Sequence, residues 1–271
     1  MKAALLFAAG LCAALPVCAE DIVDKPEEIR AHRIRTIERR LYDPSPGGMA
    51  LSGRLVLSFD RQGNMVESAG YAGDGALRSR STYKYDANGR RVDYETEPAV
   101  PGFQTSTRSY KLDQRGRVVE ERDTHRDGSP GLLRKYTLDD AGRIVEEMLY
   151  DGAGVALGGH RWRYDSDGNE VELWAVNGAG NVVQRREYEF RKKGQQLREV
   201  TYDSSNRLVG KSESVYAGER LAEVFDYHGD GRLRWHVVLE RNASGLIVKE
   251  TMFQEDGKVT SVEEITYEHH P

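Results

Sequence analysis

Aromatic and leucine side chains recur in pairs along the chain, about every 26 residues, with one residue between the two members of each pair. A valine or leucine recurs with the same period, about seven residues after each pair, and Glu and Arg fill most positions between. This alternation predicts β-strands with one buried face. The pairs are Leu57 and Phe59, Tyr83 and Tyr85, Tyr110 and Leu112, Tyr136 and Leu138, Trp162 and Tyr164, and Tyr188 and Phe190; the single column is Val66, Val92, Val119, Val145, Val171, Leu197 and Val248.

Two interleaved series of turn residues separate the predicted strands. Each repeat contains two turns with about seven or eight residues between them, which is room for one strand but not for a strand and a helix. The first series is Gly63, Gly89, Gly116, Gly142, Gly168, Gly194 and Gly245, and the second is Gly75, Gly102, Gly128, Gly154, Gly180, Asn206, Gly231 and Gly257.

The sequence therefore predicts an all-β fold, a long antiparallel meander of about 18 strands in 26-residue two-strand repeats that occupies residues 34–271. Neighbouring strands in a sheet are rotated by roughly 20° relative to each other, so we expect one curved or coiled sheet rather than a flat one. The pattern leaves open whether the sheet closes, coils or stays open.

The turns of the first series share a chemistry, as in Tyr85-Asp86-Ala87-Asn88-Gly89-Arg90. An aspartate three residues before the glycine can accept hydrogen bonds from backbone amides across the turn. The glycine adopts the positive φ that a hairpin built on a type I turn requires.

Residues 1–19 resemble a secretory signal peptide, with Lys2 before an apolar segment and a small-residue cleavage site that ends at Ala19. Lipoprotein processing at Cys18 is an alternative, although Val17 fits a lipobox poorly. The apolar segment is shorter than the ~20 residues that span a bilayer, so no integral membrane span is expected. Residues 20–33 form an N-terminal segment in which Asp24-Lys25-Pro26 predicts the start of a short helix.

Both cysteines, Cys12 and Cys18, lie in the predicted signal peptide, so we expect a mature chain without disulfides or thiolate chemistry. The formal net charge of −5 comes from charges of alternating sign rather than from a basic block. On electrostatic grounds we therefore expect neither nucleic acid nor anionic lipid as a partner.

Candidate catalytic and metal-binding motifs are weak, and we expect no enzyme activity, metal or cofactor. The segment 165–170 (Asp-Ser-Asp-Gly-Asn-Glu) has oxygen ligands at calcium-like spacing but lacks the rest of a calcium loop. Adjacent glutamates such as Glu120 and Glu121 point to opposite faces of a strand, so they cannot act together on one bond. The seven histidines form no recognisable metal-ligand pair.

Several residues depart from the repeat consensus and are the candidate binding residues. Trp174 occupies a column otherwise filled by smaller or polar side chains, and Trp235 lies between Arg234 and His236. The loop with Pro98 and Pro101 replaces a glycine-rich turn. Large aromatic residues beside arginine are typical of binding hot spots. The alternative is that both tryptophans fill gaps in the core.

The turn sequences resemble those of the YD or Rhs-type repeat family, whose signature is Tyr-Asp-x-x-Gly-Arg. Residues 85–90 match this signature in full, and residues 164–169 and 202–207 match it with one substitution each. The glycine-punctuated two-hairpin unit is also similar to the MORN-variant repeats of some bacterial antitoxin and immunity proteins. Both resemblances imply a β-meander binding scaffold rather than an enzyme.

These observations lead to the hypothesis of an exported, periplasmic, non-enzymatic protein that binds a protein partner. The MORN-variant resemblance indicates an immunity protein that neutralises a secreted toxin or effector. The alternative is a cell-wall or glycan-binding envelope module, in which tyrosine and tryptophan rings stack on sugars of peptidoglycan.

Overall fold

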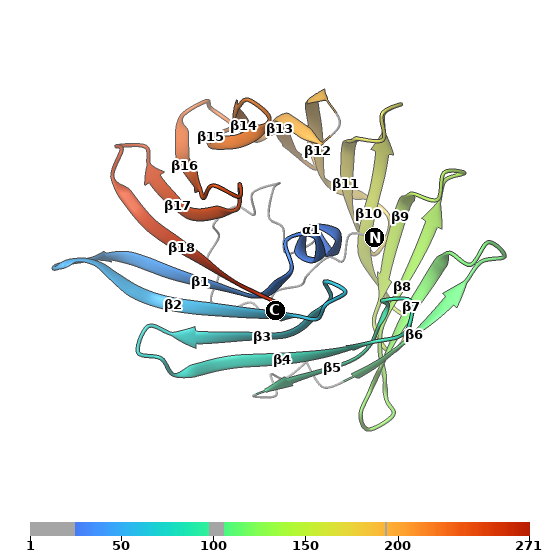
Figure 1. The fold of residues 1–271 in the computed structure, drawn as a ribbon. Helices are drawn as coiled ribbons and strands as arrows, with labels where there is room; N and C mark the ends of the chain where they lie inside the picture. The colour runs from blue at the N-terminus through green and yellow to red at the C-terminus, as the bar shows by residue number, and fades with distance from the viewer. Residues whose placement is uncertain (1–24, 98–105, 193) are drawn as a thin grey trace. The chain divides into compact units, whose positions relative to one another are not determined.

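The computed structural model describes residues 25–97, 106–192 and 194–271 (Figure 1). The predicted signal peptide, Cys18, Pro98 and Pro101 lie outside these residues. The fold is an all-β antiparallel meander of 18 strands with one short helix, which confirms the predicted fold class. The elements are α1 (Pro26–Ala31), β1 (Ile34–Ser45), β2 (Gly48–Phe59), β3 (Met65–Ala72), β4 (Leu77–Tyr85), β5 (Arg91–Glu97), β6 (Ser106–Leu112), β7 (Val118–His125), β8 (Pro130–Leu138), β9 (Ile144–Tyr150), β10 (Ala156–Tyr164), β11 (Glu170–Asn177), β12 (Val182–Lys192), β13 (Gln195–Asp203), β14 (Leu208–Ala217), β15 (Arg220–His228), β16 (Leu233–Arg241), β17 (Ile247–Gln254) and β18 (Val259–His269).

The chain divides into two compact units. The first unit contains the described residues of Met1–Phe103 together with Tyr216–Val224 and Trp235–Pro271. The second unit contains the described residues of Gln104–Val215 together with Phe225–Arg234.

The first unit decides what the sequence pattern leaves open, whether the expected curved or coiled sheet closes. β1 pairs with β2 on one edge and with β18 on the other, so that Ile37 lies opposite both Leu57 and Tyr267. The first and last strands of the meander are thus hydrogen-bonded to each other, which closes the order of paired strands. Closure satisfies the backbone groups of both terminal strands, which would otherwise be exposed at free sheet edges.

A hydrophobic core in the first unit lies on the sheet face that carries Ile37 and Leu57. Ile29 of α1 is fully buried in this core, so the helix covers this face of the sheet. The turn between β2 and β3 packs closely on the start of the helix, because a Cβ atom at Gly63 would lie 2.2 Å from the Pro26 carbonyl oxygen. The core residues are Ile29, Ile34, Ile37, Leu57, Phe59, Leu221, Val237, Leu239, Leu246, Ile247 and Ile265.

The turns follow the predicted chemistry. In the β4–β5 turn, Oδ1 of Asp86 accepts hydrogen bonds from the amides of Asn88 and Arg90, both at 2.9 Å. The Gly89 amide donates to the Asp86 carbonyl, and Gly89 has a φ of 73°. Asn206, which replaces glycine in the second series, also has a positive φ, of 59°. The position of each turn is therefore fixed by side-chain and backbone groups that lie within five residues of one another in the sequence.

One buried ion cluster supports the strands that close the sheet. Arg39 of β1 donates two hydrogen bonds to the Glu263 carboxylate of β18, at 2.8 and 2.6 Å, and lies 3.7 Å from Glu250 of β17. The two glutamates lie directly opposite each other on neighbouring strands, and both are buried. The guanidinium of Arg39 thus separates two carboxylates that would repel each other.

We predict that the turn aspartates make stability depend on pH. Hydrogen bonds from the Arg143 amide to Asp139, and from the Asn169 side chain to Asp165, hold both carboxyl pKa values below the ordinary aspartate value. A lowered native pKa stabilises the fold above the ordinary carboxyl pKa of about 3.9, and this contribution is lost as the pH falls through that value toward the native pKa.

Replacing both Asp139 and Asp165 by Asn should therefore flatten the fall in unfolding free energy between about pH 6 and pH 2.5, measured by urea denaturation. Asparagine keeps the acceptor, as Asn177 does in the β11–β12 turn. The matched control replaces Asp140 and Asp167, whose side chains accept no hydrogen bond from the described residues in the same two turns. Equal pH slopes for the two double variants would contradict the prediction.

We predict that Arg39→Met destabilises the protein by about 3–5 kcal/mol, because it leaves two glutamates buried without a cation. Arg35→Met is the control on the same strand pair: its ion pair with Glu268, at 2.7 Å, is more than half exposed on both sides and should contribute about 0–1 kcal/mol. Urea denaturation measures both losses. Similar losses for the two variants would show that the Arg39 cluster does not support closure.

Candidate binding surface

The structure separates the candidate binding residues between the two units. Trp174 lies on β11 and Arg234 at the start of β16, both in the second unit, whereas Trp235 and His236 belong to the first. Adjacent residues of β16 point to opposite faces, so Trp235 does not share a face with its two neighbours.

Trp235 is partly buried and packs against the hydrophobic core of the first unit. His236 contacts Glu223, with Nε2 at 2.8 Å from Oε2, and its ring stacks on Phe253. A core position for Trp235 matches the alternative role considered for the tryptophans. A binding role for Trp235 and His236 stays a prediction.

In the second unit, Arg234 forms an ion pair with Asp226 at 3.0 Å, and its Nε lies 3.4 Å from Nδ1 of His228. Burial raises the pKa of the Asp226 carboxyl, and the positive charge of Arg234 offsets part of that increase. Arg234 is exposed. Its guanidinium is therefore oriented by an acid while it remains accessible to solvent.

Trp174 lies in a straight row of side chains that crosses six strands of the second unit. Trp174 is directly opposite Arg161 of β10 and Arg185 of β12, and Arg185 is directly opposite Tyr202 of β13. Directly opposed residues share one face of a sheet. We call this set the tryptophan row: Glu146, Arg161, Trp174, Arg185, Tyr202 and Leu208.

The two arginines beside Trp174 are held in place by their own neighbours. Arg161 donates from Nε to Glu146 at 2.8 Å. Arg185 lies over the Tyr202 ring, 4.4 Å from its centroid, and also donates to Oδ1 of Asn206 at 2.9 Å. Trp174 itself is half-buried. Tryptophan and arginine are residue types that are typical of interface hot spots. Because both arginines are already held in one orientation, their side chains lose less conformational entropy when a partner binds.

An apolar strip borders the tryptophan row on the same face. It runs across β9, β10, β11 and β12 through Met148, Gly159, Val176 and Val182, which are paired in register. Gly159 lies diagonal to Trp174, and the backbone there is tightly packed, because a Cβ atom would lie 1.9 Å from the Glu147 carbonyl oxygen. Val176 is buried, whereas Val182 is exposed, as are the bulged neighbours Leu157 and Val183. The second unit thus presents apolar and aromatic groups beside charge.

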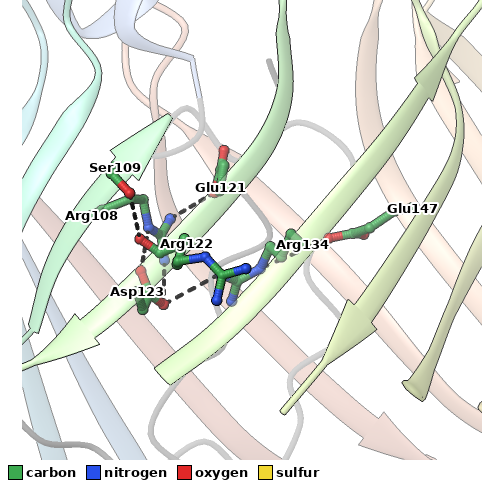
Figure 2. A network of polar contacts seen from close by, with 7 residues as sticks. All are labelled: Arg108, Ser109, Glu121, Arg122, Asp123, Arg134 and Glu147. Atoms are coloured by element: carbon green, nitrogen blue, oxygen red, sulfur yellow. Dashed lines mark hydrogen bonds and ion pairs between the residues drawn. The ribbon is translucent and has the colours of Figure 1, made fainter. Parts of the chain in front are cut away.

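The opposite face of the second unit carries a buried ion network (Figure 2). Arg108 of β6 donates from Nε to Asp123 of β7 at 2.7 Å and from a terminal nitrogen to Glu121 at 3.0 Å. Arg134 of β8 lies 3.4 Å from the same aspartate and 3.9 Å from Glu147 of β9. Carboxylates from different strands therefore meet here, although adjacent glutamates on one strand do not.

The electrostatics of this network favour the ionised arginine. Burial alone would lower the pKa of Arg108, but the hydrogen bond and charge of Asp123 and the charge of Glu121 outweigh burial and raise it. Burial and then the charges of Glu121 and Glu147 raise the pKa of the nearby Tyr136 hydroxyl. Each acid is occupied by a guanidinium, so the network is suited to holding β6–β9 together rather than to proton transfer.

Sequence reasoning missed this network, although the repeat contains a signal for it. In three repeats an arginine lies two residues before the first member of the aromatic pair: Arg108, Arg134 and Arg186. In the same repeats a glutamate lies two residues after the recurring valine or leucine: Glu121, Glu147 and Glu199. A spacing of two keeps these charges on the same face as the aromatic side chains. Glu121 and Glu147 are therefore not solvated sheet surface, because their side chains are mostly buried.

No group of three or more His, Cys, Asp or Glu side chains in residues 25–97, 106–192 and 194–271 is placed to hold a metal ion. In the segment with calcium-like spacing, Asp165 uses its oxygens to accept from the amide and side chain of Asn169. No helix in this part of the chain is long and apolar enough to cross a membrane.

Comparisons with known proteins give only remote likenesses. No family model matches the chain, and no curated protein matches it. Among solved structures, the fold is similar to a porin-like protein from Bacteroides uniformis, with 11% identity, a TM-score of 0.49 and coverage of 87% of this chain and 98% of that chain.

A LolA superfamily protein from Nitrosomonas europaea is similar with 15% identity, a TM-score of 0.27 and coverage of 93% and 92%. One chain of the TcdB2-TccC3-Cdc42 structure is similar with 12% identity and a TM-score of 0.31, over 84% of this chain and 16% of that chain. Likenesses at these TM-scores carry no argument about function. The resemblance to YD, Rhs-type and MORN-variant repeats stays a prediction.

We predict that the network of Figure 2 contributes to stability. Asp123→Ala should cost about 3–5 kcal/mol, because it leaves Arg108 buried with its main partner removed. Replacing the pair together, Arg108→Met with Asp123→Leu, should cost less than the single change, because no unpaired charge at Arg108 remains. Urea denaturation of the two variants compares the losses. A larger loss for the double variant would contradict the prediction.

Proposed function

We propose that this chain is an exported, non-enzymatic protein that binds a protein partner through the tryptophan row and the adjoining apolar strip. The observation that carries the proposal is the register of Arg161, Trp174 and Arg185 on three neighbouring strands. Interface hot spots are enriched in Trp, Tyr and Arg, and all three residue types lie in this one row.

The strand scaffold supports this role physically. The row crosses six strands, which at about 4.8 Å per strand gives a length of roughly 24 Å across the sheet. Strand positions are fixed by paired backbone hydrogen bonds, so the row is organised before a partner arrives. The charges of the row are satisfied locally, by Glu146 for Arg161 and by Glu187, together with Tyr202 and Asn206, for Arg185. Such a surface suits a protein partner whose edge offers acids and apolar side chains.

The specific partner that we propose is a secreted toxin or effector, which the protein binds and neutralises in the periplasm as an immunity protein. This step rests on the predicted signal peptide and on the resemblance to MORN-variant repeats. The neighbouring gene is the first place to look for the partner, and a phospholipase, nuclease or peptidoglycan hydrolase encoded there supports the proposal.

The surface tyrosines support the glycan-binding alternative less well than they support a protein partner. The rings of Tyr150, Tyr202 and Tyr227 each have a cation over one face, from Lys135, Arg185 and Lys211 respectively. A sugar that stacks on that face would have to displace the cation. Fluorescence quenching of the tryptophans by soluble peptidoglycan fragments would favour the glycan alternative.

We predict that Trp174→Ala weakens binding to the captured partner by more than ~1 kcal/mol and leaves the melting temperature nearly unchanged. Wild-type and variant proteins on beads are compared for the envelope protein that they retain, and the affinity for that protein is then measured by calorimetry.

Trp162→Ala is the matched control, because Trp162 lies on the neighbouring strand with its side chain on the other face. It should not change affinity. Loss of several kcal/mol of stability with undiminished affinity in Trp174→Ala would show that Trp174 is a core residue. Failure to retain any protein partner would contradict the proposed function.

A further inference from the structure

A hollow of about 260 Å³ in the first unit gathers basic side chains. It lies where α1 ends, where the β2–β3 turn bends back and where the chain reaches Pro271. Arg30, Arg33 and Arg61 line it together with His270. Backbone contacts fix the last residues there, because the His270 amide donates to the Arg33 carbonyl at 2.7 Å.

The three arginines of the hollow differ from most arginines of this protein. None of the three side chains makes a hydrogen bond or an ion pair with any of the described residues; the three are Arg30, Arg33 and Arg61. The neighbouring arginines along β1 are paired, Arg35 with Glu268 and Arg39 with Glu263. Guanidinium groups are planar forks with five donors, and they bind carboxylate or phosphate groups when such groups are near. The hollow therefore offers unused donors of one charge.

The acids nearby do not neutralise this cluster. Asp60 lines the hollow, but its Oδ1 accepts from the amides of Gln62 and Asn64, and its Oδ2 accepts from the Asn64 side chain, all at 2.9 Å. Counting Asp60 against the three arginines still leaves an excess positive charge. An anion that enters the hollow gains both this charge and free hydrogen-bond donors.

One further observation points to a ligand. The Nε2 atom of His270 is buried and has no hydrogen-bond partner in the described chain, although buried polar atoms are usually paired. Arg33 follows the end of α1 in the left-handed conformation that commonly terminates a helix, with a φ of 53°, and its amide donates to the Arg30 carbonyl at 3.0 Å. The helix end therefore fixes the position of Arg33 at the hollow.

We propose that this hollow is an anion site that takes a phosphate group. A phosphate presents more acceptor oxygens than a carboxylate, so it can engage forks from three separate arginines. The hollow is also large enough for more than an ion, since a water takes about 30 Å³ of liquid volume. The ligand is thus inorganic phosphate or a small phosphomonoester, with the phosphate between Arg30, Arg33 and Arg61.

Isothermal titration of the full mature chain with inorganic phosphate, at ionic strength held constant with sodium chloride, tests the site. Arg30→Gln and Arg61→Gln should each weaken phosphate binding about tenfold, the effect of one charge-assisted hydrogen bond. Both side chains are exposed, so the fold should be unaffected. His270→Leu should also weaken binding. Arg35→Gln, which removes a paired arginine nearby, is the matched control and should have no effect.

Three outcomes separate the sources of the phosphate. Binding of inorganic phosphate alone identifies the free ion, and tighter binding of glycerol 3-phosphate identifies a phosphomonoester. Binding only to vesicles that contain phosphatidic acid, with no response to either soluble phosphate, would overturn the proposed hollow. No heat beyond that of a chloride titration, or an equal loss in Arg35→Gln, would also overturn it. The site is independent of the tryptophan row, so Trp174→Ala should leave phosphate binding unchanged.

Discussion

The two-sided pairing of β1 is the interaction on which the first unit depends. Backbone amides and carbonyls on both edges of a strand must be paired or solvated, and a terminal strand of a meander leaves one edge free. β1 pairs with β2 and also with β18, more than 200 residues away, and so removes both free edges. The same pairing brings Ile37 together with Leu57 and Ile265 in one core, over which the buried Ile29 of α1 lies. Closure and core formation are therefore one event in this protein.

The repeating turn governs the rest of the sheet through register. Each aspartate and positive-φ glycine fixes where two strands meet, and a shift of one residue would move every side chain to the other face. With the register fixed, the two faces of the second unit acquire different chemistry. One face buries Arg108, Asp123 and Arg134 in a saturated network, and the other carries Trp174 between two oriented arginines. A face with a buried ion network and the face that we propose for binding thus arise from the same repeat.

This division explains how such a scaffold can carry the proposed binding function. Strand pairing and the buried network hold the backbone in place, so residues of the tryptophan row can vary without altering the fold. Trp174 varies from the repeat in this way, whereas Trp235 varies and packs on the core. Departure from the consensus is therefore a sign of either binding or packing, and the face decides which. The basic hollow beside α1 joins the helix, one turn of the repeat and the last described residues, and the repeat pattern gives no hint that these segments meet.

The sequence by itself determined the all-β class, the number of strands, the turn chemistry and the alternation of faces, because each depends on residues close together in the chain. It also singled out Trp174 as a departure from its column. The tertiary structure alone decided that β18 pairs with β1, that Trp235 joins a core with Ile29 and that Arg30, Arg61 and His270 share a hollow. These contacts join segments separated by tens to hundreds of residues, and a local pattern has no information about which distant segment satisfies a free strand edge or a buried charge.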